Sequence, residues 1–444
     1  MDNRPPAWGL GIYHYPPPQD ARSQHAAEMA HWNQALVEQL IQEAPIGNGI
    51  QAPPVHEVIR IANIPFTITR QEVRQSIPPQ FHLLENCPIH IIMERSTGKT
   101  IDCFIELADP NSAAELVRWL NDGVHFTRVG SRRADITASN QGELMKALFP
   151  KAKCVEWSID GEPSIRERYP DEMYSTGFTG FITQEELRCV LAYAEGPDRN
   201  TFTKKVLQRT YEALLSIVWK FPWHMTKLYT LRDRNQIFMT LRSMVELLVY
   251  KIENRHRQLL GLDGLLVSDL VHAALNCPGF NPRMKFCMVQ ISHRLDPGSV
   301  CGHLSPEALA YFPFDTLTWL HPFRVSALQF YGGLIGDGQT TSTLQAGLIN
   351  RWADPRLLTP YGRQWYEWDV NFMTPGQKYA DCIHYELVLL EALIRSGYHV
   401  RHAPILQNPY TGPSAMSARQ PVRLRIDSDQ NAEARARDFS DIPR

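Results

Sequence analysis

The sequence predicts an α+β fold in which a small domain of strands and helices over residues 55–138 precedes a mainly α-helical region over residues 180–405. Three observations support this prediction. Residues 55–138 alternate between strand-like and helix-like runs, residues after 180 carry apolar side chains at helical spacing, and 43% of the 444 residues are hydrophobic. Residues 1–20 are proline-rich and residues 409–444 are polar and charged, so we expect both ends to be disordered.

Between the proline-rich head and the first domain, residues 21–45 are expected to form an amphipathic helix. Met29, Trp32, Leu36 and Leu40 recur at helical spacing. This helix could dock on the following domain or on a partner protein, and the sequence leaves both open. The run from residue 48 to residue 54 has the composition of a linker.

Residues 55–138 predict six elements in a fixed order. Thr69 is expected to cap the first helix, with Glu72 three residues later as its capping-box partner. The third strand shows clean alternation, which would place Ile101 and Cys103 toward the core and Phe104 on the other face. The expected elements are strands at residues 58–65, 88–94, 100–107 and 132–137, and helices at 69–76 and 111–121.

The order strand-helix-strand-strand-helix-strand resembles the RNA recognition motif, a ferredoxin-type βαββαβ fold. Two segments carry the resemblance. The sequence IRIANI at residues 59–64 is similar to the family's first-strand hexamer, with Asn63 at its fifth place, and TIDCFIEL at residues 100–107 is similar to its third-strand octamer. The resemblance covers about a fifth of the chain, and it implies binding of single-stranded RNA.

Members of that family carry three outward aromatic residues that stack on bases, and this chain keeps only Phe104. Arg60 takes the aromatic place in the hexamer, and Asp102 takes the first one in the octamer. Each lost stack removes about 1–3 kcal/mol of binding. Asp102 would repel phosphate, although it could accept a hydrogen bond from a base or pair with Arg60. Phe104 is predicted to contact RNA, and the alternative is that another segment covers it.

The string from Arg60 to Phe66 is also similar to the quasi-RNA-recognition motifs of the G-tract-binding heterogeneous nuclear ribonucleoproteins, which grip guanines with loop residues. That resemblance implies base stacking by Phe66. It also implies RNA contacts from Arg95 and Lys99, which flank the loop between the second and third strands, and from Phe126 before the last strand.

Asn63 replaces the glycine of that subfamily, which leaves a guanine preference open. The alternative for Phe66 and Phe126 is that they cap the hydrophobic core. Arg133, in the expected last strand, completes the predicted RNA-binding set, although residues 55–140 hold nine Lys or Arg against ten Asp or Glu and are not basic overall.

The region after residue 180 is expected to be helical, with helices at residues 185–194, 201–220, 235–260, 265–276 and 377–397, and an irregular aromatic-rich segment at 278–375. Residues 201–260 hold eleven Lys or Arg and four Asp or Glu. This excess could form an auxiliary phosphate-binding surface. The alternative is that these charges lie on solvated helix faces and pair with acidic residues elsewhere.

The sequence offers little support for catalysis, cofactors, metals or membranes. The glycine-rich run at residues 333–340 nearly spells a phosphate-binding loop, but Gln339 stands where the lysine is needed. Cys277, Cys287, Cys301 and His303 match no tight zinc spacing. No nucleophile and base form a recognisable set, and no apolar run is long enough to span a membrane. We therefore expect a non-enzymatic chain without cofactor or metal.

Two functions remain after this reasoning. The first is binding of single-stranded RNA, with the helical region adding affinity or recruiting proteins. The second is a protein-interaction scaffold, in which the degenerate RNA-recognition fold holds protein instead, and partners could also use the helix at residues 21–45. The eight cysteines include no CxxC pair, and no signal peptide is visible, so we expect a nuclear or cytoplasmic protein that is not secreted.

Overall fold

The structure is a computed structural model of the chain, and all of the residues that it describes lie within residues 1–402. They are residues 52–122, 128–129, 132–167, 177–254, 261–280 and 282–292, together with the isolated residues 338, 378–380, 393 and 396–397. The predictions for residues 1–20, 21–45 and 409–444, for the run at 333–340 and for most of the helix at 377–397 lie outside this part of the chain.

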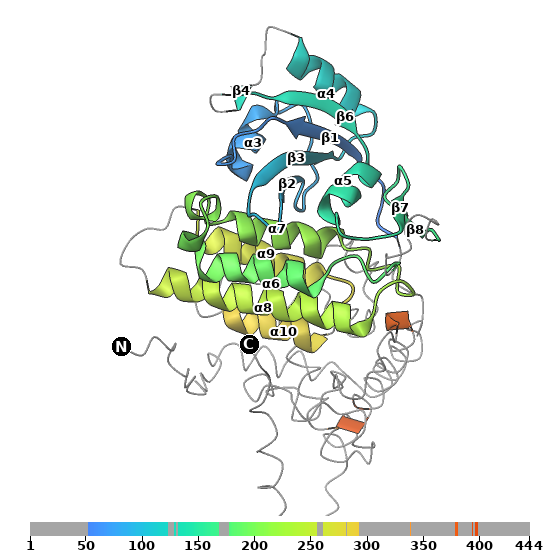
Figure 1. Cartoon of the computed structure of the whole chain (residues 1–444), viewed down its shortest axis with the longest axis vertical. Coiled ribbons are helices and arrows are strands. Elements are labelled where there is room, and N and C mark those ends of the chain that lie inside the picture. The colour runs from blue at the N-terminus through green and yellow to red at the C-terminus, as the bar shows by residue number, and fades with distance from the viewer. Residues whose placement is uncertain are drawn as a thin grey trace, which may run out of the picture. The chain divides into compact units, whose positions relative to one another are not determined.

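The N-terminal half of the described chain is an α+β unit with a small antiparallel sheet (Figure 1). Four strands form this sheet in the order β2-β3-β1-β6, and β4 and β5 form a separate two-stranded ribbon. The elements are β1 (Glu57–Ala62), α3 (Arg70–Ser76), β2 (Ile89–Met93), β3 (Thr100–Leu107), α4 (Ser112–Asn121), β4 (Arg128–Val129), β5 (Arg132–Arg133) and β6 (Asp135–Ser139). The expected mixture of α and β structure is therefore observed, but the strand predicted at residues 132–137 is divided between β5 and β6.

Helix α3 begins where its capping signal predicts. Thr69 adopts an extended backbone, its hydroxyl accepts a hydrogen bond from the Glu72 backbone N–H, and the Glu72 carboxylate accepts one from the Thr69 backbone N–H at 2.7 Å. This capping box satisfies two donors that the first turn of a helix leaves unpaired. It fixes the start of the helix at Arg70.

One face of the sheet packs on α3 and α4 around an apolar core of its own. Alternate residues of the central strands point into this core, among them Ile59, Ile61, Cys103 and Ile105, all 0% exposed. Ile101 was predicted to point inward as well, and this is wrong, because its side chain is 45% exposed. It lies near the start of β3, where the pairing with β2 shifts register between Ile91 and Met93.

After β6 the chain forms a helix that the sequence did not predict, α5 (Gln141–Leu148), and the hairpin β7 (Val155–Trp157) and β8 (Pro163–Ile165). No helix was predicted for residues 140–183. The signal for α5 is present in the sequence, since Asn140 accepts a hydrogen bond from the Glu143 backbone N–H. Helix α5 has only eight residues, and this shortness hides its periodicity.

Five helices follow and lie beneath the sheet in Figure 1. They are α6 (Gln184–Glu195), α7 (Arg209–Lys220), α8 (Leu231–Glu253), α9 (Gly264–Asn276) and α10 (Pro282–Ser292), with short 3-10 turns η2 (Pro197–Arg199) and η3 (Thr203–Lys205) before α7. Helix α8 starts earlier than the predicted residue 235, because Thr230 and Asp233 form a capping box. Helix α10 lies in a segment that was expected to be irregular.

The prediction of one helix over residues 201–220 is wrong in its first part. The side-chain oxygen of Asn200 accepts hydrogen bonds from the backbone N–H groups of Phe202 and Thr203, at 2.8 and 3.2 Å. Such a turn offers the backbone an alternative to helical hydrogen bonds. The regular helix therefore begins only at Arg209. None of the described helices is long and apolar enough to cross a membrane.

Candidate functional site

The second face of the sheet, which we call the outer face, is the one predicted to meet RNA. A row of residues crosses it from β6 to β2, because Arg60 pairs with Thr137 on one side and Phe104 on the other, and Phe104 pairs with His90. Exposure falls along this row. Thr137 is exposed and the Arg60 side chain is 44% exposed, but Phe104 is 3% and His90 0% exposed.

Helix α7 is the element that covers the β2 and β3 half of the outer face, and it lies directly against β2 (Figure 1). Helix α5 packs beside it, on β1 and α7. Val58, Ile92 and Phe104 belong to the same apolar cluster as the buried residues of α7, such as Tyr211, Leu214 and Val218. The core of the helical region is therefore continuous with the outer face of the sheet.

A buried polar network joins this face to the two covering helices. The Glu106 carboxylate of β3, 2% exposed, is bonded to the His90 Nε2 at 2.8 Å, the Lys220 Nζ at 2.8 Å and the Gln141 Nε2 at 2.7 Å. Lys220 also donates to the Gln141 side-chain oxygen at 2.8 Å. A buried carboxylate is stable only when it is paired and hydrogen-bonded, and Glu106 meets both conditions.

The pKa values of this network follow from its burial. Burial alone would raise the pKa of Glu106, but the ammonium of Lys220 and the hydrogen bond from His90 lower it far below its ordinary value. Burial lowers the pKa of His90, and this effect outweighs the hydrogen bond and negative charge of Glu106, which raise it. The imidazole is therefore neutral and donates from Nε2, while its buried Nδ1 has no partner in the described part of the chain.

Two buried arginines make further bridges between the sheet and the helices. Arg209 of α7 donates to the backbone oxygen of Ile68 and the hydroxyl of Thr100, and pairs with Glu212 at 2.5 Å. Arg95, which follows β2, pairs with Glu186 of α6 at 2.5 Å and donates to the backbone oxygen of Leu148. Each guanidinium thus binds one carboxylate and one backbone oxygen.

The loop between β2 and β3 is held by the helical region. The Tyr193 hydroxyl donates to the Ser96 backbone oxygen at 2.6 Å, and the Asn200 side chain donates to the Thr97 backbone oxygen at 2.7 Å. Gly98 follows with φ +72°, and a Cβ there would lie 2.9 Å from the Thr203 methyl group. This close approach and the left-handed backbone both require glycine.

The structure corrects two of the predicted RNA contacts. Phe104 lies inside the core shared with α7, so its ring is not available to stack on a base. Arg95 is 7% exposed and bound to Glu186, so it does not flank an open loop. Phe66 is half-buried, meets the Phe202 ring edge-on at 6.0 Å and lies under the Lys205 ammonium at 5.0 Å. Its ring contacts residues that precede α7, and its predicted part in RNA binding stays a prediction.

Of the remaining predicted contacts, Arg60, Asn63, Lys99, Asp102 and Arg133 lie on strands or at strand ends of the α+β unit. Arg60 pairs with Asp102 at 2.7 Å, one of the two possibilities raised for that carboxylate. The Asn63 side chain, at a residue with φ 56°, donates to the Arg133 backbone oxygen at 3.0 Å. Lys99 and Arg133 are exposed. Phe126 lies outside the described residues.

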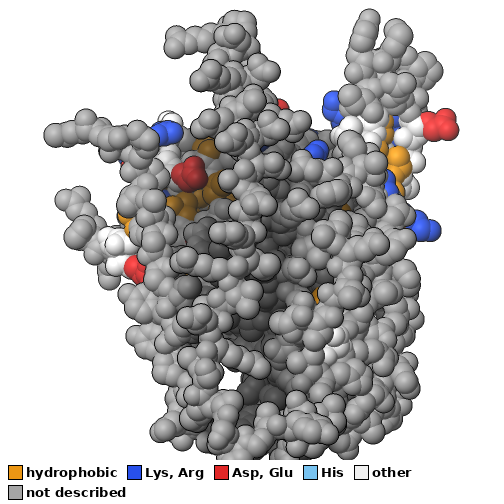
Figure 2. All heavy atoms as spheres, turned by 90° about the horizontal axis from the view of Figure 1, so that it is seen from below, with side chains coloured by type: hydrophobic (Ala, Val, Ile, Leu, Met, Phe, Trp, Pro, Cys, Tyr) orange, Lys and Arg blue, Asp and Glu red, His pale blue; other side chains and the backbone are white. Residues whose placement is uncertain are grey.

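The basic stretch at residues 201–260 does not form one surface among the described residues. Arg209, Lys220 and Arg242 are engaged in ion pairs with buried or partly buried carboxylates, and Arg234 is 0% exposed. Lys204, Lys227 and Arg232 are exposed. In the view of Figure 2, the visible described charges of both signs are scattered singly among other side chains.

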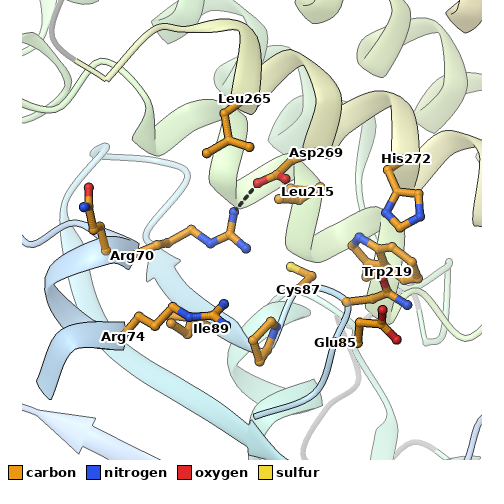
Figure 3. Close-up of a pocket in the computed structure, with 13 residues that line it drawn as sticks. Arg70, Arg74, Glu85, Cys87, Ile89, Leu215, Trp219, Leu265, Asp269 and His272 are labelled. Carbon is orange, nitrogen blue, oxygen red and sulfur yellow. Dashed lines mark hydrogen bonds and ion pairs between the residues drawn. The ribbon is translucent and has the colours of Figure 1, made fainter. Parts of the chain in front are cut away.

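A pocket of about 430 Å³ opens beside the covered face, between α3, the loop that leads into β2, and helices α7 and α9 (Figure 3). Arg70 and Arg74 come from α3, and Glu85, Asn86 and Cys87 from the loop. Leu215 and Trp219 of α7 and Leu265, Asp269 and His272 of α9 form the other walls. Arg70 crosses to Asp269, and the two groups pair at 2.9 Å.

Burial sets the protonation of two groups in this pocket. It lowers the pKa of His272, which meets the Trp219 ring edge-on at 6.0 Å and is neutral at pH 7. It raises the pKa of the Cys87 thiol to about 12, so the thiol stays protonated and unreactive. Among the described residues, no three His, Cys, Asp or Glu side chains are placed to hold a metal ion.

Two family models match the chain, and neither carries a known function. Residues 55–159 are similar to a domain of unknown function (DUF8400), and residues 178–294 are similar to a second one (DUF8399). No curated protein and no solved structure matches the chain. The first match includes α5 and β7 together with the sheet, and the second runs from α6 to α10.

Sequence reasoning raised the covered face only as the alternative for Phe104, and it missed the Glu106 network and the pocket. One signal was available: Glu106 and His90 are polar residues on the same face as Phe104, in strands otherwise rich in isoleucine. Polar residues at such positions face either water or a buried partner, and alternation along a strand does not distinguish the two. The partners Gln141 and Lys220 lie 35 and 114 residues away from Glu106 in the sequence.

Proposed function

We propose that this chain is a non-enzymatic interaction scaffold, in which an RNA-recognition-motif-like unit holds a helical unit and the two together present surfaces to partner proteins. The observation that carries the proposal is the burial of Phe104, His90 and Glu106 under α7. The strand order β2-β3-β1-β6, with α3 and α4 on one face, supports the ferredoxin-type description of the sheet.

The outer face is poorly suited to read RNA for a physical reason. Base stacking requires an aromatic ring open to solvent, and the ring kept in this sheet is enclosed by apolar side chains of α7. Exposing it would break the buried pairs of Glu106 with Lys220 and of Arg95 with Glu186. Leaving one partner of such a pair buried and alone costs about 3–5 kcal/mol.

The partners proposed here are proteins, and the cysteines are compatible with a nuclear or cytoplasmic setting. Six cysteines are described, all of them as free thiols, and five of these are buried. Buried thiols of this kind pack as small apolar side chains and need no oxidising compartment.

A pair of measurements on the full chain tests the proposal. Fluorescence anisotropy with labelled G-rich and pyrimidine-rich RNAs that lack a terminal phosphate, across a salt series, should show no binding above background at low salt. Hydrogen exchange should protect the amides of β2 and β3 as strongly as those of α7, because the three form one interface. A partner protein found by crosslinking in a cell extract should bind the purified chain with fixed stoichiometry.

The variant Phe104→Leu separates the two functions, because leucine keeps most of the buried volume and removes the stacking ring. Salt-sensitive RNA binding that is lost in Phe104→Leu, with unchanged stability, would overturn the scaffold proposal. Ile101→Leu is the matched control, since Ile101 lies in the same strand and its side chain is 45% exposed.

A second candidate is RNA binding by the exposed basic residues of the α+β unit. Three exposed basic residues favour it. They are Arg60 on β1, whose side chain is 44% exposed, Lys99 just before β3, and Arg133 on β5. Binding of this kind would rest on phosphate contacts and fall steeply with salt. It would weaken in Lys99→Ala and Arg133→Ala and stay unchanged in Phe104→Leu.

A further inference from the structure

The pocket between α3, α7 and α9 has the size and position of a ligand site. Its volume of about 430 Å³ falls within the range of about 300–1,000 Å³ that small-molecule sites occupy. It lies where the sheet unit meets the helical unit, and such junctions are preferred places for ligands. The proposed scaffold function does not require this pocket.

One end of the pocket holds two arginines and one carboxylate, and therefore carries a net positive charge. Arg70 and Arg74 lie one helical turn apart on α3, on the same face, where like charges disfavour each other. Asp269 pairs with one terminal nitrogen of Arg70, while the buried Nε of Arg70 has no partner in the described part of the chain. The exposed Arg74 guanidinium points into the same opening (Figure 3).

The opposite end of the pocket has an indole ring, from Trp219, and an exposed carboxylate, from Glu85. Figure 3 shows Trp219, His272 and Glu85 together on the side away from the two arginines, with Cys87 between the ends. Trp219 is half-buried, and an indole is a good stacking surface for a planar base. The Glu85 carboxylate is exposed and accepts hydrogen bonds such as those from a base amino group.

We propose that this pocket binds a nucleoside monophosphate whose base carries an exocyclic amino group. The phosphate lies at Arg70 and Arg74, which present forked donors that match its oxygens. The base lies over the apolar floor of Cys87 and Leu215 against Trp219, and its amino group donates to Glu85. An aromatic amino acid fits less well, because its acid and amine share one carbon and cannot reach both ends.

The same chemistry could come from a free nucleotide or from the phosphorylated end of an oligonucleotide. This proposal goes beyond the scaffold function and does not rest on it, because the pocket lies outside the covered sheet face. If RNA does not bind the outer face, the nucleotide proposal is unaffected. If no nucleotide binds the pocket, the scaffold proposal is likewise unaffected.

Isothermal titration calorimetry of the full chain with CMP and UMP tests the proposal, since the two differ at the group that faces Glu85. CMP is expected to bind about tenfold more tightly than UMP. Arg74→Ala should weaken both nucleotides by a similar factor of about ten. Glu85→Gln should weaken CMP and bring the two affinities together, because an amide can both donate and accept.

Arg118→Ala is the matched control, because Arg118 is an exposed arginine on α4, away from the pocket, and its loss should leave binding unchanged. Circular dichroism confirms that each variant folds. Two outcomes would overturn the proposal: no heat with CMP at millimolar concentration, or binding that inorganic phosphate alone competes with equally well. A tetranucleotide with and without its 5′-phosphate then distinguishes an RNA end from a free nucleotide.

Discussion

Replacing Phe104 by alanine is expected to lower the free energy of unfolding by about 4 kcal/mol. The side chain is 3% exposed and sits between β3 and α7. A phenylalanine that buries about 150–200 Å² of apolar surface contributes about 4–5 kcal/mol at about 25 cal/mol per Å². Alanine retains a small part of this contribution, and the cavity that remains adds a cost of its own, so the total stays near the Phe→Ala range of about 3–5 kcal/mol.

Urea unfolding of the full chain, followed by tryptophan fluorescence, measures this change. Ile101→Ala is the control in the same strand, and it should cost less than about 1.5 kcal/mol because nearly half of that side chain is exposed, at 45%. A loss below about 1 kcal/mol in Phe104→Ala would refute the reasoning, because a ring open to solvent has little burial to lose.

Three further outcomes follow from the same interface. Lys220→Met leaves the Glu106 carboxylate buried without its cation and should cost about 3 kcal/mol, whereas adding Glu106→Gln should restore part of the loss, and a double-mutant cycle without coupling would contradict the pair. The folded pKa values of His90 and Glu106 both lie below their ordinary values of 6.5 and 4.5, so the unfolded chain binds more protons and stability falls as the pH drops below about 6.5 and again below about 4.5. Denaturant midpoints from pH 8 to 4 measure this. In His90→Gln the first step should become smaller and not vanish, because burial also lowers the pKa values of His56 and His272. Thr183→Ala removes the capping box of α6 and should cost about 1 kcal/mol in the same assay, with Thr183→Ser close to the original chain.

Much of the α+β unit was predictable because its signals are local. Alternation in β3 placed Cys103 and Ile105 on one face and Phe104 on the other, and the structure has them so. The Thr69 and Glu72 pair marked the start of α3. These features depend on residues two to four positions apart, which the sequence shows directly.

The predicted site was less successful, and Arg95 shows why. A lone arginine beside a loop looks available for phosphate, yet here its guanidinium meets Glu186, 91 residues further along the chain. Arg60 and Asp102 lie in adjacent strands, so their pairing could be foreseen. The pocket joins Arg70 to Asp269, which are 199 residues apart, and no spacing in the sequence indicates their meeting.

By itself the sequence indicated the mixed α and β character of this chain and which residues in the middle of β1 and β3 share a face. Only the tertiary structure decided which face meets water. Periodicity tells which side chains share a face, but burial depends on what covers that face, and the cover here is α7, about a hundred residues after β3. The same distant packing turned Phe104 from a predicted RNA contact into part of the core.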